Sequence, residues 1–266
     1  MPQVINTNMM SLNSQRALNK SQMSMQTSLE RLSSGLRINR AKDDAAGLAI
    51  TERITSQVRG LDQAIRNAND GISLLQTAEG ALNEVTNALQ RMRELAVQAR
   101  NGTYNAADRA SLHDEFHALQ DEIKRIADVT EFNNINLLGN ASSRSMQVGW
   151  ENGANNVIAV STVNLNSNAN SGILFALSDA SIAITATGST GSIDNAMSSI
   201  SMALDRIASV RADFGAIQNR LESSVRNMEN VIENQSAARS RIQDADFARE
   251  TANLTRTQIP LSYTTL

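Results

Sequence analysis

Two histidines one helical turn apart are the residues of this chain best suited to chemistry. His113 and His117 occupy positions i and i+4, so on a helix their imidazoles would share one face and could bind zinc. Zinc peptidases place a glutamate directly after the first histidine, and here Asp114 holds that position. The chain has no other histidine and no cysteine. The sequence therefore predicts no catalytic metal site, and we favour a solvated polar face over weak metal binding.

The adjacent acids Asp43 and Asp44 do not form a catalytic pair. Neighbouring residues on a helix point about 100° apart, so their carboxylates do not converge. We interpret them as acids at the start of a helix, where the macrodipole favours negative charge. A second interpretation is contact with the basic residues at 37–42 of a neighbouring copy, because a segment that carries both signs is self-complementary.

No other motif brings catalytic side chains together. The Gly188–Gly191 segment lacks the following lysine of a phosphate-binding loop, so it reads as a turn. An enzyme is therefore the least favoured class, and no cofactor is expected.

Composition excludes several classes of partner. The net charge of −3 disfavours nucleic acid, which requires a basic surface. No stretch approaches the ~18 consecutive apolar residues of a membrane span. The N-terminus lacks a basic stretch followed by an apolar one, so no cleavable secretory signal is predicted. An aromatic content of 3% indicates a thin aliphatic core rather than a thick globular one.

A helical pattern covers residues 1 to about 140. A first seam with steps of three and four is formed by Leu18, Gln22, Met25, Leu29, Leu32 and Leu36. The pattern breaks between Gly35 and Gly47, which predicts a bend or a change of helix packing. It resumes from Ile54 through Ile65 and Ile72 to Ala96. Asn101-Gly102 is a stop signal, a further helix follows, and Asn133-Asn134 marks a turn.

Residues 191 to about 259 carry the most regular heptads. Apolar residues recur at alternating steps of four and three over 193–242, including Met197 and Leu204, with Arg211, Gln218, Gln235 and Arg239 at the remaining seam positions. At about 1.5 Å per residue that stretch would span roughly 75 Å. A compact domain of this length has a radius of gyration of only about 18 Å. The sequence therefore predicts a mainly α fold, a long antiparallel coiled-coil helical rod formed by the N- and C-terminal segments.

Residues 141–190 differ from both ends. They are poor in charge and rich in Ser, Asn, Gly and Thr, and β-branched or alternating runs occur at 145–150, 156–165 and 173–184. We expect a small β-rich central insert, with a disordered loop as the alternative.

Motifs at the two ends of the chain closely resemble those of bacterial flagellin. The matching stretches are 1–8 (MPQVINTN), 32–39 (LSSGLRIN), 41–50 (AKDDAAGLAI) and 240–250 (SRIQDADFARE). The resemblance covers about 1–140 and 190–259, in the family's order. The middle corresponds to the part that varies within the family and adds no support.

The resemblance implies a structural subunit that self-assembles into the extracellular flagellar filament for motility. It implies export by the flagellar type III apparatus without a cleaved signal. By the same resemblance, 1–44 and 246–266 are inner-tube segments, 45–140 with 191–245 is the helical rod domain, and 141–190 is the variable insert. The residues expected to serve self-assembly are Leu29, Leu32, Leu36, Arg37, Asp43, Asp44, Ala46, Gly47, Asp244, Asp246 and Phe247.

Toll-like receptor 5 is the animal partner that the resemblance implies. The matching stretch is 89–98 (LQRMRELAVQ), and the expected contacts are Gln90, Arg91, Glu94, Leu95, Gln98 and Glu115. Arg91 with Leu95 one turn later would form a charged rim beside an apolar knob, which is typical of a binding hot spot. Without the resemblance, an ordinary helix surface would be the preferred interpretation.

The C-terminus departs from the family pattern. After Ile259 the family continues as an amphipathic helix, whereas Pro260 is expected to break the helix here. We therefore expect residues 1 to about 40 to be frayed or held by another chain, and polymerisation to be poor. The export chaperone grips that helix in the family, so its partnership is doubtful.

Two other classes remain open. A hook–filament junction protein has ends that resemble flagellin more loosely, and the fidelity of 32–50 and 240–250 favours flagellin over it. A non-flagellar coiled-coil interaction module would also show heptads, but it usually carries a membrane anchor or a secretory signal.

Overall fold

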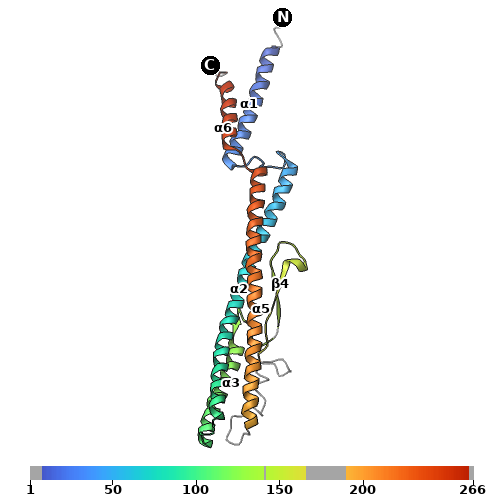
Figure 1. Ribbon diagram of the computed structural model, residues 1–266. Helices are drawn as coiled ribbons and strands as arrows, with labels where there is room; N and C mark the ends of the chain where they lie inside the picture. Colours follow the sequence, from blue (N-terminus) through green and yellow to red (C-terminus); the bar gives the residue numbers. More distant parts are fainter. Residues whose placement is uncertain (1–7, 141, 166–189, 264–266) are drawn as a thin grey trace. The chain divides into compact units, whose positions relative to one another are not determined.

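The computed structural model describes residues 8–140, 142–165 and 190–263, and it divides the chain into two compact units (Figure 1). Unit 1 comprises residues 1–60 and 229–266, and unit 2 comprises residues 61–228. The helices α2 (Ala45–Arg100) and α5 (Thr190–Gln243) contribute residues to both units. Five long helices account for most of the described chain, which confirms the prediction of a mainly α fold.

Within unit 2, α2 and α5 run antiparallel. Arg100 forms an ion pair with Asp194 at 3.2 Å. Farther back along α2, Glu79 lies 3.5 Å from Arg211. Because the α2 residue number falls as the α5 number rises, the two chain directions are opposed. The predicted antiparallel pairing is confirmed for this unit.

The helix seams of unit 2 hold a closely packed core in which small residues alternate with large ones. On α2 the buried seam runs through Leu61, Ala64, Ala68, Gly71, Leu75, Ala78, Leu82, Val85, Leu89, Met92, Ala96 and Ala99. The sequence pattern predicted Ile65 and Ile72 as seam residues. That prediction was wrong, because both are only half-buried beside the seam. A Cβ added to Gly71 would lie 3.4 Å from Leu221 of α5, so the backbone comes close to its partner there.

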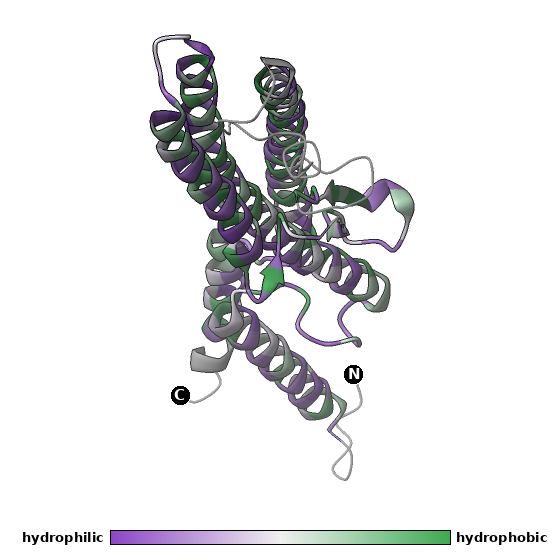
Figure 2. Cartoon of the chain, turned by 90° about the horizontal axis from the view of Figure 1, so that it is seen from below, coloured by the Kyte–Doolittle hydropathy of each residue, from purple (hydrophilic) through white to green (hydrophobic). Residues whose placement is uncertain are grey.

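In the α5 seam, too, small residues are buried where larger neighbours are only half-buried. Ala196, Ala203 and Val210 are buried, while Met197 and Leu204 are half-buried. Small side chains let two helices approach closely, and the larger neighbours then flank the contact. Figure 2 shows the resulting alternation of hydrophobic and hydrophilic residues around the helices.

Helix α3 (Ala106–Val129) follows α2 after the predicted stop at Asn101-Gly102. Asn105 caps its first turn by accepting from the Asp108 N–H at 2.8 Å, and the Asp108 carboxylate accepts from the Asn105 N–H at 3.1 Å. This reciprocal capping box satisfies N–H groups that a helix start otherwise leaves unpaired. The buried residues of α3 are Phe116, Ile123 and Ala127.

Two antiparallel hairpins form the β structure among the described residues of unit 2. Strands β1 (Glu131–Phe132) and β2 (Ile135–Asn136) join through Asn133 and Asn134, which adopt φ of 51° and 61° as a two-residue hairpin turn requires. Strands β3 (Ser143–Gln147) and β4 (Val157–Ser161) pair from Ser143–Ser161 to Gln147–Val157, and a short 3-10 helix, η1 (Ala154–Asn156), precedes β4. The β-rich insert is thus confirmed for two of the three expected runs. The third, at 173–184, lies outside the described residues.

In unit 1, helix α1 (Met9–Ser34) packs beside helix α6 (Phe247–Tyr263), as Figure 1 shows. The Ser21 hydroxyl donates to the Thr257 carbonyl at 3.2 Å, and Arg31 lies 3.7 Å from the buried Glu250. The expectation that residues up to about 40 would be frayed was wrong for residues 8–40. Residues 247–263 form a helix that pairs with α1, although the sequence analysis expected the helix to stop at Pro260 and to leave α1 without a partner.

The seam of α1 also differs from the prediction. It runs through Leu18, Ser21, Met25, Ser28 and Leu32, whereas Gln22 and Leu29 are exposed. The prediction placed Gln22 and Leu29 in the seam, but the smaller Ser21 and Ser28 occupy it and let α6 approach. The helix break expected at Pro260 was also wrong, because α6 continues to Tyr263. A proline removes one backbone donor, and the next residues can still donate to earlier carbonyls.

Residues 35–44 connect α1 to α2 and account for the predicted interruption. Gly35 ends α1 with φ of 70°, a left-handed conformation that glycine adopts without strain. The connection then pairs with the end of α5, because Arg37 N–H donates to the Gln243 carbonyl at 2.7 Å. Ala245 N–H donates back to the Gly35 carbonyl at 2.9 Å. Within this unit α2 also pairs antiparallel with α5, through Gln57–Gln235 at 3.1 Å.

Candidate functional site

Unit 1 exposes an unusual amount of apolar surface and has almost no core of its own. Only two of the 33 buried hydrophobic residues of the described chain, Ile38 and Val58, belong to it. Eight of the 12 exposed large hydrophobic residues belong to it, namely Met9, Met10, Leu12, Met23, Leu29, Ile50, Phe247 and Ile259. Exposed apolar side chains in such density mark surfaces that bury themselves against another molecule.

The predicted assembly residues divide into exposed and internally bound groups. Leu29 and Phe247 are 46% and 68% exposed, and Ala46 is also exposed. Leu32 and Leu36 are half-buried. The exposed Met9, Met10, Leu12, Met23 and Ile50 were not among the predicted assembly residues, because a residue outside a helix seam carries no local signal of what covers it.

Arg37 and Asp244 hold the chain together internally. The Arg37 guanidinium donates to the Ile242 carbonyl at the end of α5. Leu36 and Asp244 form an isolated antiparallel bridge. These contacts fix where the segments before α2 and after α5 cross.

The acidic residues of this region act as caps. Asp44 accepts from the Gly47 N–H at 2.8 Å, three residues into α2, which is N-cap geometry. Asp246 does the same for α6, accepting from the Ala248 N–H at 3.0 Å. Asp43 accepts from the Arg40 N–H at 3.0 Å, and this bond is the main cause that lowers the pKa of its carboxyl. The interpretation as a helix-start residue is therefore confirmed for Asp44 and wrong for Asp43, which accepts from amides of the loop before α2.

Gly47 is buried because its own chain covers it. A Cβ at this position would lie 2.7 Å from Cδ1 of Ile38, a residue only 2% exposed. The glycine thus serves packing within unit 1.

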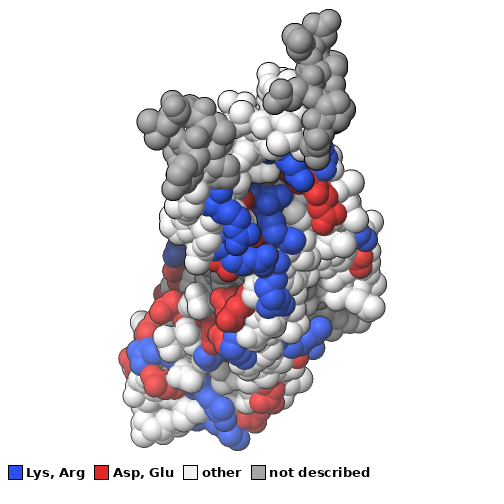
Figure 3. All heavy atoms as spheres, turned by 90° about the horizontal axis from the view of Figure 1, so that it is seen from above, with Lys and Arg blue, Asp and Glu red and all other residues white. Residues whose placement is uncertain are grey.

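Figure 3 shows Lys and Arg side chains gathered beside Asp and Glu side chains on the face that it views, so both signs of charge are available to a partner there.

A second surface joins α2 and α3 in unit 2. The Arg91 guanidinium donates to the Glu115 carboxylate at 2.9 Å across the two helices and to Glu94 at 2.9 Å along α2. The hydrogen bond to Glu115 is the main cause that raises the pKa of Arg91, and the hydrogen bond to Glu94 adds to it. All three side chains are about half exposed or more, and Gln90 is exposed beside them. The half-buried Gln98 donates to the Tyr104 hydroxyl at 3.0 Å. The arrangement is a rigid, charged surface.

Leu95 does not belong to that surface. It is completely buried, so the prediction that it forms an exposed apolar knob beside Arg91 was wrong. Residue 95 falls on the side of α2 that carries the buried Met92 and Ala96. The exposed apolar residue is Val97, 52% accessible and one turn beyond Glu94. Sequence spacing alone could not separate these two neighbours.

The two histidines lie on one face of α3, with ring centroids 4.2 Å apart and planes at 85°. His113 is half-buried and His117 is exposed. Burial is the main cause that lowers the pKa of His113, and the nearby His117 adds to it. The described residues contain no group of three or more His, Cys, Asp or Glu side chains that could hold a metal ion.

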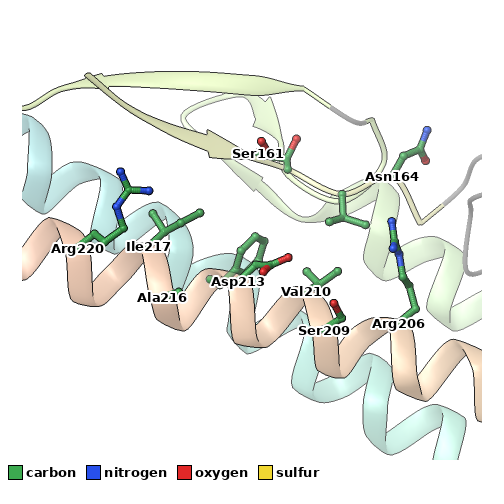
Figure 4. A pocket seen from close by; sticks show the side chains of 12 residues that line it. Ser161, Asn164, Arg206, Ser209, Val210, Asp213, Ala216, Ile217 and Arg220 are labelled. Carbon is green, nitrogen blue, oxygen red and sulfur yellow. The ribbon is translucent and has the colours of Figure 1, made fainter. Parts of the chain in front are cut away.

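A groove of about 600 Å³ lies between the segment after β4 and α5 (Figure 4). Val163, Val210, Phe214 and Ile217 provide apolar lining, and the titratable residues among the described lining are Arg206, Asp213 and Arg220. Among these described residues no nucleophile stands beside a base. The groove could not be predicted from local sequence, because its two walls come from segments about 40 residues apart.

Comparison with known proteins gives consistent matches. The family model described as "Bacterial flagellin N-terminal helical region" matches residues 5–143, and "Bacterial flagellin C-terminal helical region" matches residues 197–265. The chain is 46% identical to a flagellin of Halalkalibacterium halodurans, covering 96% of this chain and 91% of that protein. It is 35% identical to flagellin A of Vibrio cholerae, covering 96% and 93%.

Solved structures agree with these sequence matches. The crystal structure of Bacillus cereus flagellin is 30% identical, with a TM-score of 0.51, and covers 61% of this chain and 88% of that one. No described helix is long and apolar enough to cross a membrane.

Proposed function

The chain belongs to the bacterial flagellin family and is a structural subunit of the flagellar filament, and from this premise we propose that copies of it join through the exposed apolar side chains of unit 1. The single observation that carries the proposal is the imbalance between the two units. Unit 1 holds eight of the 12 exposed large hydrophobic residues but two of the 33 buried ones.

Free energy gives the reason for association. Each large apolar side chain moved from water into a contact contributes about 1.5–3 kcal/mol, and a helix pair alone buries only one stripe of each helix. Met23 lies on the side of α1 away from the seam with α6, and Ile259 lies outside the half-buried stripe of α6. Contacts with neighbouring copies would remove these side chains from water.

Surface variants test the proposal. We replace Phe247 by Ser and Met23 by Gln in unit 1, and replace the 58% exposed Met202 by Gln in unit 2 as a matched control. Each purified chain is incubated with short filament seeds, and elongation is followed by sedimentation and electron microscopy. We expect each unit 1 variant to raise the critical concentration about tenfold, since roughly 1.4 kcal/mol is a factor of ten. Equal impairment by the Met202 variant, or no elongation by the parent chain, would contradict the proposal.

A second proposal concerns recognition by Toll-like receptor 5. We assign the contact surface to Gln90, Arg91, Glu94 and Glu115, with Val97 in the apolar role first expected of Leu95. Support comes from exposure and rigidity, because Arg91 is held by two carboxylates and needs little ordering when it binds. Arginine is a residue type enriched in binding hot spots, and the exposed Val97 follows Glu94 by three residues on the same helix.

Receptor activation in reporter cells tests this assignment. Arg91→Ala and Glu115→Ala are compared with Arg125→Ala, which removes another exposed Arg–Glu pair of α3, that with Glu122. We expect the first two to raise the half-maximal concentration at least tenfold and the third to leave it unchanged. Circular dichroism checks that all three remain helical. An equal effect of all three would show that general charge, not this surface, governs activation.

A third proposal concerns localisation. We propose that the subunit acts outside the cell after export through the flagellar type III apparatus, with no segment removed. Intact mass measurement of subunits sheared from cells tests this point, and a mass short by an N-terminal segment would refute it. Deleting an export-gate component should retain the chain inside the cell.

A further inference from the structure

The histidine pair on α3 has a geometry that the flagellar role does not use. His113 and His117 belong to consecutive turns of one capped helix, and their ring centroids lie 4.2 Å apart with the planes at 85°. Two imidazole nitrogens bound to one metal ion at about 2.0–2.1 Å can be at most about 4 Å apart. A small change in the side-chain torsions would bring a nitrogen of each ring to a shared ion, because the helix already fixes both backbones.

Neither imidazole is held by a hydrogen bond or an ion pair in the described structure, and Nδ1 of His113 is buried without a partner. The ring of His117 also lies edge-on to Phe116, with the ring centroids 6.5 Å apart. A metal ion binds the neutral form of histidine, in which one ring nitrogen keeps a free lone pair. No hydrogen bond or ion pair therefore has to be broken before an ion binds.

We propose that His113 and His117 chelate a single divalent first-row transition ion, with Cu²⁺ held more tightly than Ni²⁺ or Zn²⁺. The preference follows the general affinity order of nitrogen sites for these ions. Water fills the remaining coordination positions, since no third His, Cys, Asp or Glu joins the pair among the described residues. Nδ1 of His113 also lacks the acceptor that strengthens dedicated metal sites. The site is therefore an open, exchangeable one.

The chain offers an unusually clear test, because these are its only histidines and it has no cysteine. The intact protein is titrated with Cu²⁺ near neutral pH, and binding is followed by calorimetry and by electron paramagnetic resonance. We expect one ion per chain and nitrogen hyperfine structure from two imidazoles. Replacing either histidine by glutamine removes a direct ligand. Loss of a group that only hydrogen-bonds to a metal ligand costs roughly 10–100-fold in affinity, so we expect at least that loss in either variant.

A matched variant separates chelation from binding at single histidines. The double change His117→Gln with Ala118→His keeps two histidines but moves one to position i+5, which points away from His113. Ala118 is exposed, so the change leaves the core intact. Chelation predicts that this variant binds Cu²⁺ as weakly as either single variant. Two ions per chain, one imidazole in the spectrum, or full affinity in the shifted variant would overturn the proposal.

Discussion

Replacing Leu95 by alanine distinguishes a core residue from a receptor contact. Leu95 is fully buried on α2, and its buried neighbours Met92, Ala96 and Ala99 are also completely inaccessible. A site enclosed by such neighbours cannot collapse to fill the lost volume. A buried Leu→Ala change costs about 2–5 kcal/mol, which combines lost transfer free energy with the cavity left behind. We take about 3 kcal/mol as the expected loss in the free energy of unfolding.

That loss is measurable by urea unfolding followed by circular dichroism. With a slope of about 2 kcal/mol per molar urea, the midpoint should fall by roughly 1.5 M. The matched control is Val97→Ala, two residues away and 52% exposed, which should change the free energy of unfolding by less than about 0.5 kcal/mol. The two variants should therefore separate clearly on stability.

Receptor activation should separate them in the opposite order. Measured where both chains are folded, Leu95→Ala should activate Toll-like receptor 5 like the parent, and Val97→Ala should be weaker. The reasoning is refuted if Leu95→Ala keeps the parent urea midpoint while losing activation. That result would mean that the side chain is accessible to the receptor.

Three further changes probe one buried hydrogen bond, one close packing contact and one exposed loop carboxylate. Thr162 is buried, and its hydroxyl accepts from the Ser142 N–H at 2.9 Å, so Thr162→Val should cost about 1–3 kcal/mol in a urea experiment, and no loss would show that water replaces the bond. Gly47→Ala would press a Cβ to 2.7 Å from the buried Ile38, so we expect about 1–3 kcal/mol of destabilisation, and a more stable variant would disprove the close packing. The pKa of Asp43 is lowered below its ordinary value of 3.8 in the folded chain. The contribution of its carboxylate to folding stability is therefore fully present above 3.8 and is lost as pH falls through the folded pKa. Nuclear magnetic resonance of the two loop amides that it accepts from should show the change below pH 3.8, and Asp43→Asn should show it at neutral pH.

The periodic pattern of apolar residues was enough to place the long helices. Steps of three and four along 193–242 and 54–96 require a helix whose one stripe is buried, and each stripe needs a partner to gain its burial free energy. Stop signals at Asn101-Gly102 and Asn133-Asn134 were also read correctly. These are local features, set by backbone conformations that particular residues favour.

Which residues occupy the seam could not be derived in the same way. Ala64 and Ile65 are adjacent, and only the partner helix decides which one faces it. The same holds for Leu95 and Val97, one buried and one exposed. Hydrophobicity favours burial of the larger residue, but close approach of two helices favours the smaller one. Which of the two residues is buried depends on the neighbouring helix, and the local sequence does not identify that neighbour.

The sequence by itself determined that this chain is mainly helical, that its two longest helical segments pair antiparallel, and that it belongs with flagellins. The heptads and the terminal motifs that show this are local features and recur densely along the chain. The tertiary structure alone decided that α6 covers α1, that Leu95 is core, and that His113 and His117 meet without a hydrogen bond or an ion pair among the described residues. Those outcomes depend on which surfaces face one another across long stretches of chain. Burial and contact are properties of that arrangement rather than of any residue type.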